Sequence, residues 1–521
     1  MLHKPTTSQL RSLASQNHFK LTAEELKVFQ PIIESTLESY SRLDELAGSK
    51  KQQQSKIRRD KGRKPSREEN PLGAWAWICS IKQEEEKNPK KSGQLLAGKR
   101  IAIKDNVQVA GVPLRNGSPL FVGFVSSIDA TVVKRILEEG GEIVGKSTCE
   151  NLCVSGGSHT SYPQPVRNPR NPEYMAGGSS SGSAALLAAG QVDMAIGGDQ
   201  GGSIRIPSSW CGVYGIKPTI GLVPYTGIIG MDPVLDHVGP MANTVYDLAT
   251  LLEAIAGRDG SDMRQINVPE KLPSYTEALR NESPIDGMKI GLVTEGFGWE
   301  GISEKDVDAI VRESAFSTFR DKLGAEVSEI SIPEHRDAIH IWTCLVMEGT
   351  WYHSFRANGL EHHWAGEYDL NLLEHWARAV KRSGDKLPEM GKIISLVGSY
   401  AAAEQSGKYY GLAMNLRREL IRAYDSALQE YDLLLMPTTP NKAIPFGRGK
   451  MNLEQSTAAS MGNLHNTCAF DASGHPALSA PCSQGENGLP VGLMLAGRYF
   501  DEVTILRAAS AFEKATKKKE F

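Results

Sequence analysis

The chain has 521 residues, of which 40% are hydrophobic and 23% are charged, and its formal net charge is -3. This is the composition of an ordinary globular protein with a large core. The nearly balanced charge gives no electrostatic reason to expect nucleic acid or an anionic membrane as the main partner. The N-terminus lacks the apolar segment of a secretory signal, and no run of roughly 18 apolar residues predicts a membrane span.

The cysteines are odd in number and scattered, which favours free thiols in a reducing compartment and so a cytoplasmic protein. Cys149 and Cys153 are four residues apart, but no second CxxC or HxxxH pair accompanies them. We therefore expect packing thiols and no metal site. The seven cysteines are Cys79, Cys149, Cys153, Cys211, Cys344, Cys468 and Cys482.

The first part of the chain differs from the rest. Thr22 and Glu25 have the spacing of a capping box. The apolar residues that follow at helical spacing are Leu26, Phe29, Ile33, Leu37 and Tyr40. Pro31 should kink this helix or divide it in two. Residues 50–67 are basic and nearly free of apolar side chains, which favours a solvated connector over a nucleic-acid arm. We predict a helical extension with a basic linker over residues 1–94 and a second domain over residues 95–521.

Strand and helix patterns alternate in this second domain. The expected strands are 100–104, 142–144, 194–196, 288–293, 325–330, 433–436 and 491–495, and the expected helices are 130–139, 303–322 and 503–514. Asp129 is the expected cap of the helix over 130–139. This alternation predicts an α/β fold with a central mixed sheet.

Residues 140–147, GGEIVGKS, match the phosphate-loop pattern GxxxxGK[ST]. A phosphate loop should follow a strand and open a helix, whereas this segment follows a predicted helix and continues as a strand. We therefore interpret it as a helix-to-strand turn, with nucleotide binding as a minor alternative.

Other common catalytic motifs lack their expected context. No GxGxxG occurs at a strand-to-helix junction, and GSSSG at 178–182 has the letters of GxSxG but no predicted strand before it, so it is not the expected strand–helix elbow. Four histidines lie near glycine- or proline-rich loops, but none has an obvious orienting carboxylate. They are His159, His237, His465 and His475. A histidine base therefore has no specific support.

Two glycine- and serine-rich loops, at 177–182 and 197–203, bring backbone N–H groups and hydroxyls close to any ligand. Lys104 ends the strand RIAIK, where an ordinary strand-end lysine would fit as well. A lysine that is neutral can act as a base, and a serine hydroxyl can relay a proton from a second, nucleophilic serine. Lys104 and the serine loops could therefore supply acyl-transfer chemistry.

The run over residues 177–219 and the segment RIAIKDN resemble the signature of the amidase signature family, and the likeness extends from about residue 96 to the C-terminus. The resemblance implies a large central mixed β-sheet surrounded by helices. It also implies that Ser203 is the nucleophile, Ser179 a bridging serine after a cis peptide bond, and Lys104 the base. Ser181 stands where the family more often has glycine, so Ser180 remains an alternative to Ser179.

By the same resemblance, the backbone N–H groups of Gln200, Gly201, Gly202 and Ser203 form an oxyanion hole. Asp199 and Arg205 brace this loop and are not reactants. No metal or organic cofactor is required. The residues implied for the acyl pocket, for each of which plain core packing is an equal alternative, are Val154, Leu235, Trp342 and Leu495.

The N-terminal extension and the segment ENPLGAWAW at 69–77 resemble bacterial amidases associated with nitrile degradation. Those enzymes hydrolyse aliphatic and aromatic carboxamides to acid and ammonia, and their extension contributes to dimer formation. We therefore expect a homodimer acting on a small-molecule amide. The alternatives are an aryl acylamidase or carbamate hydrolase, and a transamidation component that acts on misacylated tRNA, which the long extension argues against. A non-catalytic scaffold is disfavoured because all three triad positions are present.

Overall fold

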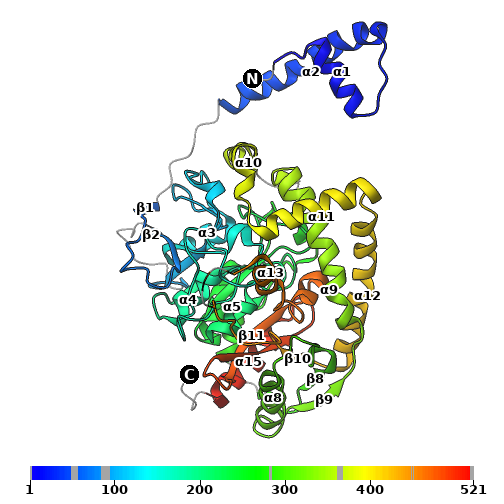
Figure 1. The fold of residues 1–521 in the computed structure, drawn as a ribbon. Coiled ribbons are helices and arrows are strands. Elements are labelled where there is room, and N and C mark those ends of the chain that lie inside the picture. Colours follow the sequence, from blue (N-terminus) through cyan, green and yellow to red (C-terminus); the bar gives the residue numbers. More distant parts are fainter. Residues whose placement is uncertain are drawn as a thin grey trace. The chain divides into compact units, whose positions relative to one another are not determined.

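The computed structural model describes residues 3–48, 57–83, 94–280, 284–360, 368–447, 449 and 451–516 (Figure 1). The chain divides into two compact units, Met1–Lys56 and Ile57–Phe521. Among the described residues, no helix is both long enough and apolar enough to cross a lipid bilayer.

The first unit consists of helices α1 (Thr7–Gln16) and α2 (Ala23–Gly48). The predicted capping box is present: the Thr22 N–H donates to Glu25 Oε2 at 2.8 Å, and the Glu25 N–H donates to Thr22 Oγ1 at 3.2 Å. Pro31 lies inside α2, which continues through it as one helix.

The predicted domain boundary at 94/95 differs from the observed division at 56/57. Strands β1 (Ile57–Arg63) and β2 (Trp75–Gln83) pair antiparallel and join the sheet of the second unit. The basic residues of β1 are mostly exposed because this strand lies at the edge of the sheet, where charged side chains are common. Asp129, the predicted helix cap, instead pairs with Arg59 of β1 and accepts from the Ala110 N–H at 2.8 Å.

The described part of the second unit contains a twelve-stranded sheet in the order β1-β2-β4-β3-β5-β7-β6-β11-β12-β10-β8-β9. Parallel pairs join β3 to β4 and β5, and β8 to β9 and β10, while the other pairs are antiparallel. The remaining strands are β3 (Arg100–Lys104), β4 (Glu142–Ser147), β5 (Met194–Asp199), β6 (Tyr214–Lys217), β7 (His237–Ala242), β8 (Lys289–Val293), β9 (Glu326–Ile330), β10 (Leu433–Pro437), β11 (Ala477–Gln484) and β12 (Pro490–Ala496). The predicted α/β fold with a mixed sheet is confirmed.

Helices surround this sheet (Figure 1). They are α3 (Thr131–Glu138), α4 (Ser181–Ala188), α5 (Arg205–Cys211), α6 (Val245–Ile255), α7 (Tyr275–Arg280), α8 (Lys305–Glu313), α9 (Glu334–Cys344), α10 (Leu370–Ser383), α11 (Glu389–Gln405), α12 (Lys408–Glu430), α13 (Leu453–Met461), α14 (Cys468–Ser473) and α15 (Glu502–Thr516). Every residue of α5 and nearly every residue of α4 is buried, which suits the small and apolar side chains of α4.

Parallel pairing brings the ends of two strands together. β3 and β5 run parallel, so Lys104 at the end of β3 and Asp199 at the end of β5 lie at the same edge of the sheet. The loop after β5 leads into α5, and the serines before α4 approach the same edge. Ligand sites of open α/β sheets commonly lie at such carboxyl ends.

Candidate active site

Lys104 and Ser179 meet inside the protein. Lys104 Nζ lies 2.8 Å from Ser179 Oγ and 3.0 Å from the carbonyl oxygen of Gly198, to which it donates. Both side chains are fully buried. The peptide bond between Gly178 and Ser179 is cis, as the resemblance implied. The lysine amine thus contacts the serine hydroxyl at a place where neither side chain is exposed to water.

The structure distinguishes Ser179 from its neighbours. Ser180 Oγ donates to the Gly198 carbonyl and accepts from the Gly198 N–H, both at 3.1 Å, so its hydroxyl is occupied by the backbone of β5. Ser181 begins α4 and lies 3.4 Å from the Thr148 carbonyl. Neither of these hydroxyls contacts the lysine, and the geometry therefore favours Ser179 over Ser180 as the relay.

A second buried lysine provides a useful contrast. Lys146, the lysine of the phosphate-loop pattern, lies within β4, and its Nζ pairs with the Asp105 carboxylate at 3.0 Å. Its segment is a turn followed by a strand, not a loop that opens a helix. Lys146 therefore has a structural ion-pair partner, whereas Lys104 is directed at a hydroxyl and a carbonyl.

The loop between β5 and α5 carries Ser203, which is 6% exposed. Within the described parts of the chain, no acceptor pairs with the backbone N–H groups of Gly201, Gly202 or Ser203. Buried N–H groups are normally paired, so three unpaired ones in sequence beside a serine indicate a place for a negatively charged oxygen. Gly202 has φ +138°, a conformation that disfavours other residues.

A buried charge network holds this loop from behind. Asp199 Oδ2 accepts from the Ile204 N–H and from Arg205 Nε, both at 3.0 Å, and Arg205 Nη2 donates to Asp199 Oδ1 at 3.0 Å. Arg205 Nη2 also donates to Asp471 Oδ2 at 2.7 Å. Asp199 and Arg205 thus brace the loop as expected, while Asp471, some 270 residues further along the chain, had no sequence signal.

The two carboxyl groups have opposite pKa shifts. Burial opposes ionisation of Asp199, but the charge and hydrogen bonds of Arg205 outweigh it and lower the pKa. Burial, followed by the negative charge of Asp199, raises the pKa of Asp471 well above its ordinary value. The network therefore favours a negative charge on Asp199 and disfavours one on Asp471.

The model of the amidase family matches residues 74–506, most of the second unit. The chain belongs to the amidase family. An enantioselective amidase of Rhodococcus rhodochrous is 40% identical over 517 residues, covering 99% of this chain and 96% of that protein. A glutamyl-tRNA(Gln) amidotransferase subunit of Methanosarcina mazei is 37% identical over 432 residues, which cover 81% of this chain and 85% of that protein.

Solved structures agree with this family membership. A glutamyl-tRNA(Gln) amidotransferase subunit of Thermotoga maritima matches with a TM-score of 0.68 and 30% identity, covering 87% of this chain and 89% of that one. A peptide amidase of Stenotrophomonas maltophilia matches with a TM-score of 0.67 and 29% identity, and the match covers 81% of this chain and 83% of that one. The resemblance to the amidase signature family is thereby confirmed, and the protein is an amidase-family hydrolase.

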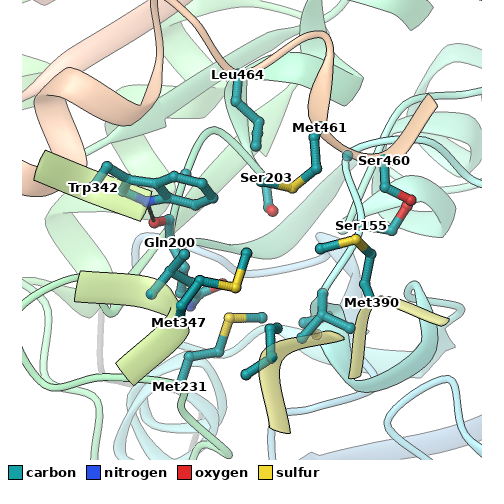
Figure 2. Close-up of a pocket in the computed structure, with 16 residues that line it drawn as sticks. Ser155, Gln200, Ser203, Met231, Trp342, Met347, Met390, Ser460, Met461 and Leu464 are labelled. Atoms are coloured by element: carbon teal, nitrogen blue, oxygen red, sulfur yellow. Dashed lines mark hydrogen bonds between the residues drawn. The ribbon is translucent and has the colours of Figure 1, made fainter. Parts of the chain in front are cut away.

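Ser203 of this amidase opens onto a cavity with about 410 Å³ of empty space, counting its mouth (Figure 2). Val154 and Trp342 line it, as predicted for an acyl pocket. Leu235 and Leu495 are fully buried and are not part of its lining, which corrects the prediction for these two. Leu495 lies near the end of β12, in register with Leu435 and Leu478, and so belongs to the sheet core.

Sequence reasoning missed most of the lining. Four methionines from separate segments line the cavity onto which Ser203 opens: Met231, Met347, Met390 and Met461 (Figure 2). Cys153, Val346, Ile394 and Leu464 complete the apolar wall. Apolar residues dispersed over so many elements have no pattern in the sequence, because core and pocket positions share the same composition.

The four histidines considered earlier have contacts of their own. His159 Nε2 lies 3.0 Å from Ser456 Oγ, His237 Nδ1 lies 2.8 Å from the Leu235 carbonyl, and His475 Nε2 lies 3.1 Å from Asp425. The ring of His465 packs against Trp299. The seven cysteines are all free, and the thiols of Cys149 and Cys153 both approach Asn116 Oδ1.

Proposed function

We propose that this amidase hydrolyses neutral carboxylic acid amides with apolar acyl groups to the acid and ammonia. The observation that supports this most directly is the contact of Lys104 Nζ with Ser179 Oγ at 2.8 Å, next to the loop that carries Ser203. Lysine, relay serine and nucleophilic serine are sufficient to activate a hydroxyl without histidine or metal.

In the proposed reaction, neutral Lys104 takes a proton from Ser179 while Ser179 takes one from Ser203. Ser203 Oγ then attacks the amide carbonyl. The unpaired N–H groups of Gly201, Gly202 and Ser203 stabilise the oxygen as it becomes negative. The proton returns through Ser179 to the departing nitrogen, ammonia leaves, and water hydrolyses the acyl-enzyme by the same relay.

The cavity supports a preference for apolar acyl groups. Within the described residues its lining includes no charged side chain, and methionine supplies much of the wall. Methionine is unbranched and flexible, so such a wall can adapt to aliphatic and aromatic groups alike. A charged acyl group would lose its hydration there without gaining a partner of opposite charge.

The second candidate is a component of an amidotransferase complex, which the relatives of that name favour. The Methanosarcina relative covers 81% of this chain, whereas the Rhodococcus amidase covers 99%. The full-length similarity therefore supports a free-standing amidase more than a member of a complex.

An amide panel assayed for ammonia, and for aniline in the case of the anilide, tests the proposal. Benzamide, a short aliphatic amide, an anilide and a carbamate probe the acyl and leaving groups, and L-glutamine serves as a charged amide of similar size. We expect ammonia from benzamide and the aliphatic amide, and a rate on glutamine lower by about tenfold or more, since a polar group buried without partners costs about 1–3 kcal/mol. Activity on glutamine alone, or only after a partner protein is added, would contradict the proposal.

We also propose that the first unit supports a homodimer. Helix α2 carries exposed apolar side chains, among them Val28, Phe29, Ile32 and Leu43. An apolar face of this kind on a small helical unit is typical of an interaction surface. Size-exclusion chromatography with light scattering should give a dimer for the full chain and a monomer after removal of residues 1–48; a dimer from both would contradict this role.

A further inference from the structure

Two side chains from outside the loop hold successive carbonyl groups of the segment that precedes Ser203. Trp342 Nε1, on α9, donates to the Gln200 carbonyl oxygen at 2.6 Å. The Thr467 hydroxyl, directly before α14, donates to the Gly201 carbonyl oxygen, also at 2.6 Å. Figure 2 shows the first of these bonds beside Ser203.

These bonds fix two N–H directions. A trans peptide unit is planar, with its C=O and N–H pointing in opposite directions. The peptide bonds after Gln200 and Gly201 are trans. Holding the Gln200 carbonyl therefore directs the Gly201 N–H away from Trp342, and holding the Gly201 carbonyl directs the Gly202 N–H away from Thr467.

The same two side chains explain why the loop has consecutive glycines. A Cβ on Gly201 would lie 2.6 Å from the Trp342 ring, and a Cβ on Gly202 would lie 2.2 Å from Thr467 Oγ1. Both distances are shorter than a non-bonded contact allows. Glycine is thus required for Trp342 and Thr467 to approach the backbone closely enough to bond it.

Thr467 is itself rigidly placed. The side-chain amide of its neighbour Asn466 donates to the carbonyls of Gly296 and Pro437, both at 2.8 Å, and accepts from Trp299 Nε1 at 2.8 Å. The Thr467 hydroxyl also lies 3.1 Å from the Leu464 carbonyl, but it has a single proton, and the Gly201 oxygen is closer.

We propose that Thr467 and Trp342 are positioning residues for the oxyanion hole, which aim the N–H groups of Gly201 and Gly202 at the developing negative charge. This inference rests on the proposed function, because it assigns a task to the loop beside Ser203. Thr467 is the cleaner probe of the two, since it is not among the residues that line the cavity, whereas Trp342 is.

The test compares Thr467→Val, which keeps the shape and removes the donor, with Thr467→Ser, which keeps the donor. Removing one oxyanion-hole donor outright lowers kcat by about 100- to 1000-fold. A donor that is kept but wrongly oriented should therefore lower kcat by about 10- to 100-fold. KM should change by less than about threefold, because the Michaelis complex has little charge on the oxygen. Thr467→Ser should remain within about threefold of the wild-type kcat.

A second readout distinguishes a change in the orientation of the N–H groups from a general disturbance of the structure. A boronic acid that carries the acyl group of the best substrate forms a tetrahedral adduct with serine. Its inhibition constant should rise in Thr467→Val by a factor similar to the fall in kcat, and should be unchanged in Thr467→Ser. If Thr467→Val does not fold, Trp342→Phe, which removes the indole donor, takes its place with the same expected effects on kcat and boronate affinity.

The outcomes distinguish the inference from the proposed function. Full activity in Ser203→Ala would overturn the proposed function itself. An inactive Ser203→Ala together with a folded Thr467→Val that keeps the wild-type kcat and boronate affinity would overturn only the role of Thr467. Equal losses in Thr467→Val and Thr467→Ser would also overturn it, because the hydroxyl would then be irrelevant.

Discussion

Replacing Asp199 or Asp471 with asparagine should have very different consequences, although both carboxyl groups contact Arg205. Asp199 accepts four N–H groups, two from the backbone after Ser203 and two from the guanidinium. An asparagine there has one acceptor oxygen and places its NH₂ group against these donors. It also removes the negative charge that balances Arg205 inside the protein.

The charge of Asp471 matters less than that of Asp199, because burial and the negative charge of Asp199 both oppose its ionisation and raise its pKa. Asp471 Oδ2 accepts from Arg205, and Asp471 Oδ1 lies 3.5 Å from His237 Nδ1. An asparagine at this position can still accept from Arg205 through its side-chain oxygen.

The expected magnitudes differ accordingly. Removing one member of a buried ion pair costs about 3–5 kcal/mol, which we expect for Asp199→Asn. Asp471→Asn keeps an acceptor for Arg205 and removes a charge that its surroundings disfavour, so it should cost about 1 kcal/mol or less. Urea unfolding at pH 7, followed by circular dichroism, measures both. A loss of stability in Asp471→Asn equal to or larger than that in Asp199→Asn would refute the assignment of charges.

Two further predictions concern the relay serine and acid stability. Ser179→Ala should abolish amide hydrolysis because it disconnects Lys104 from the nucleophile, whereas Ser180→Ala should retain most of the activity; the reverse order in an ammonia assay would reassign the relay. Burial lowers the pKa of His335 to about 4 from 6.5. Between these values the unfolded chain binds a proton that the native state does not, so stability should fall by up to about 3 kcal/mol as the pH drops from 6.5 to 4. His335→Gln should show a shallower loss over that range in urea unfolding, and an unchanged slope would count against His335 as the cause.

The proposed reacting groups could be selected from the sequence because they lie in short contiguous segments. Lys104 ends a recognisable strand, and the serines lie in two glycine-rich loops within one stretch of chain. Strand β1 was missed because the lysines and arginines of an edge strand have the composition of a linker. Sequence composition does not reveal that their backbone pairs with β2.

The supporting residues were hidden for a different reason. Thr467, Asp471 and the pocket methionines are brought to the loop by tertiary contacts between distant segments. Leu235 and Leu495 were assigned to the pocket although they pack in the core, since apolar character does not distinguish the two environments. Of the implied pocket residues, Val154 and Trp342 do line the cavity.

Mass spectrometry of the enzyme during turnover tests the central claim most directly. An activated ester with an apolar acyl group, mixed with the protein and quenched with acid, should leave an acyl group on the peptide that contains Ser203. The adduct should be absent from Ser203→Ala and should form much more slowly in Lys104→Ala, if that lysine is the base. An adduct on another residue, or one that persists in Ser203→Ala, would contradict the account.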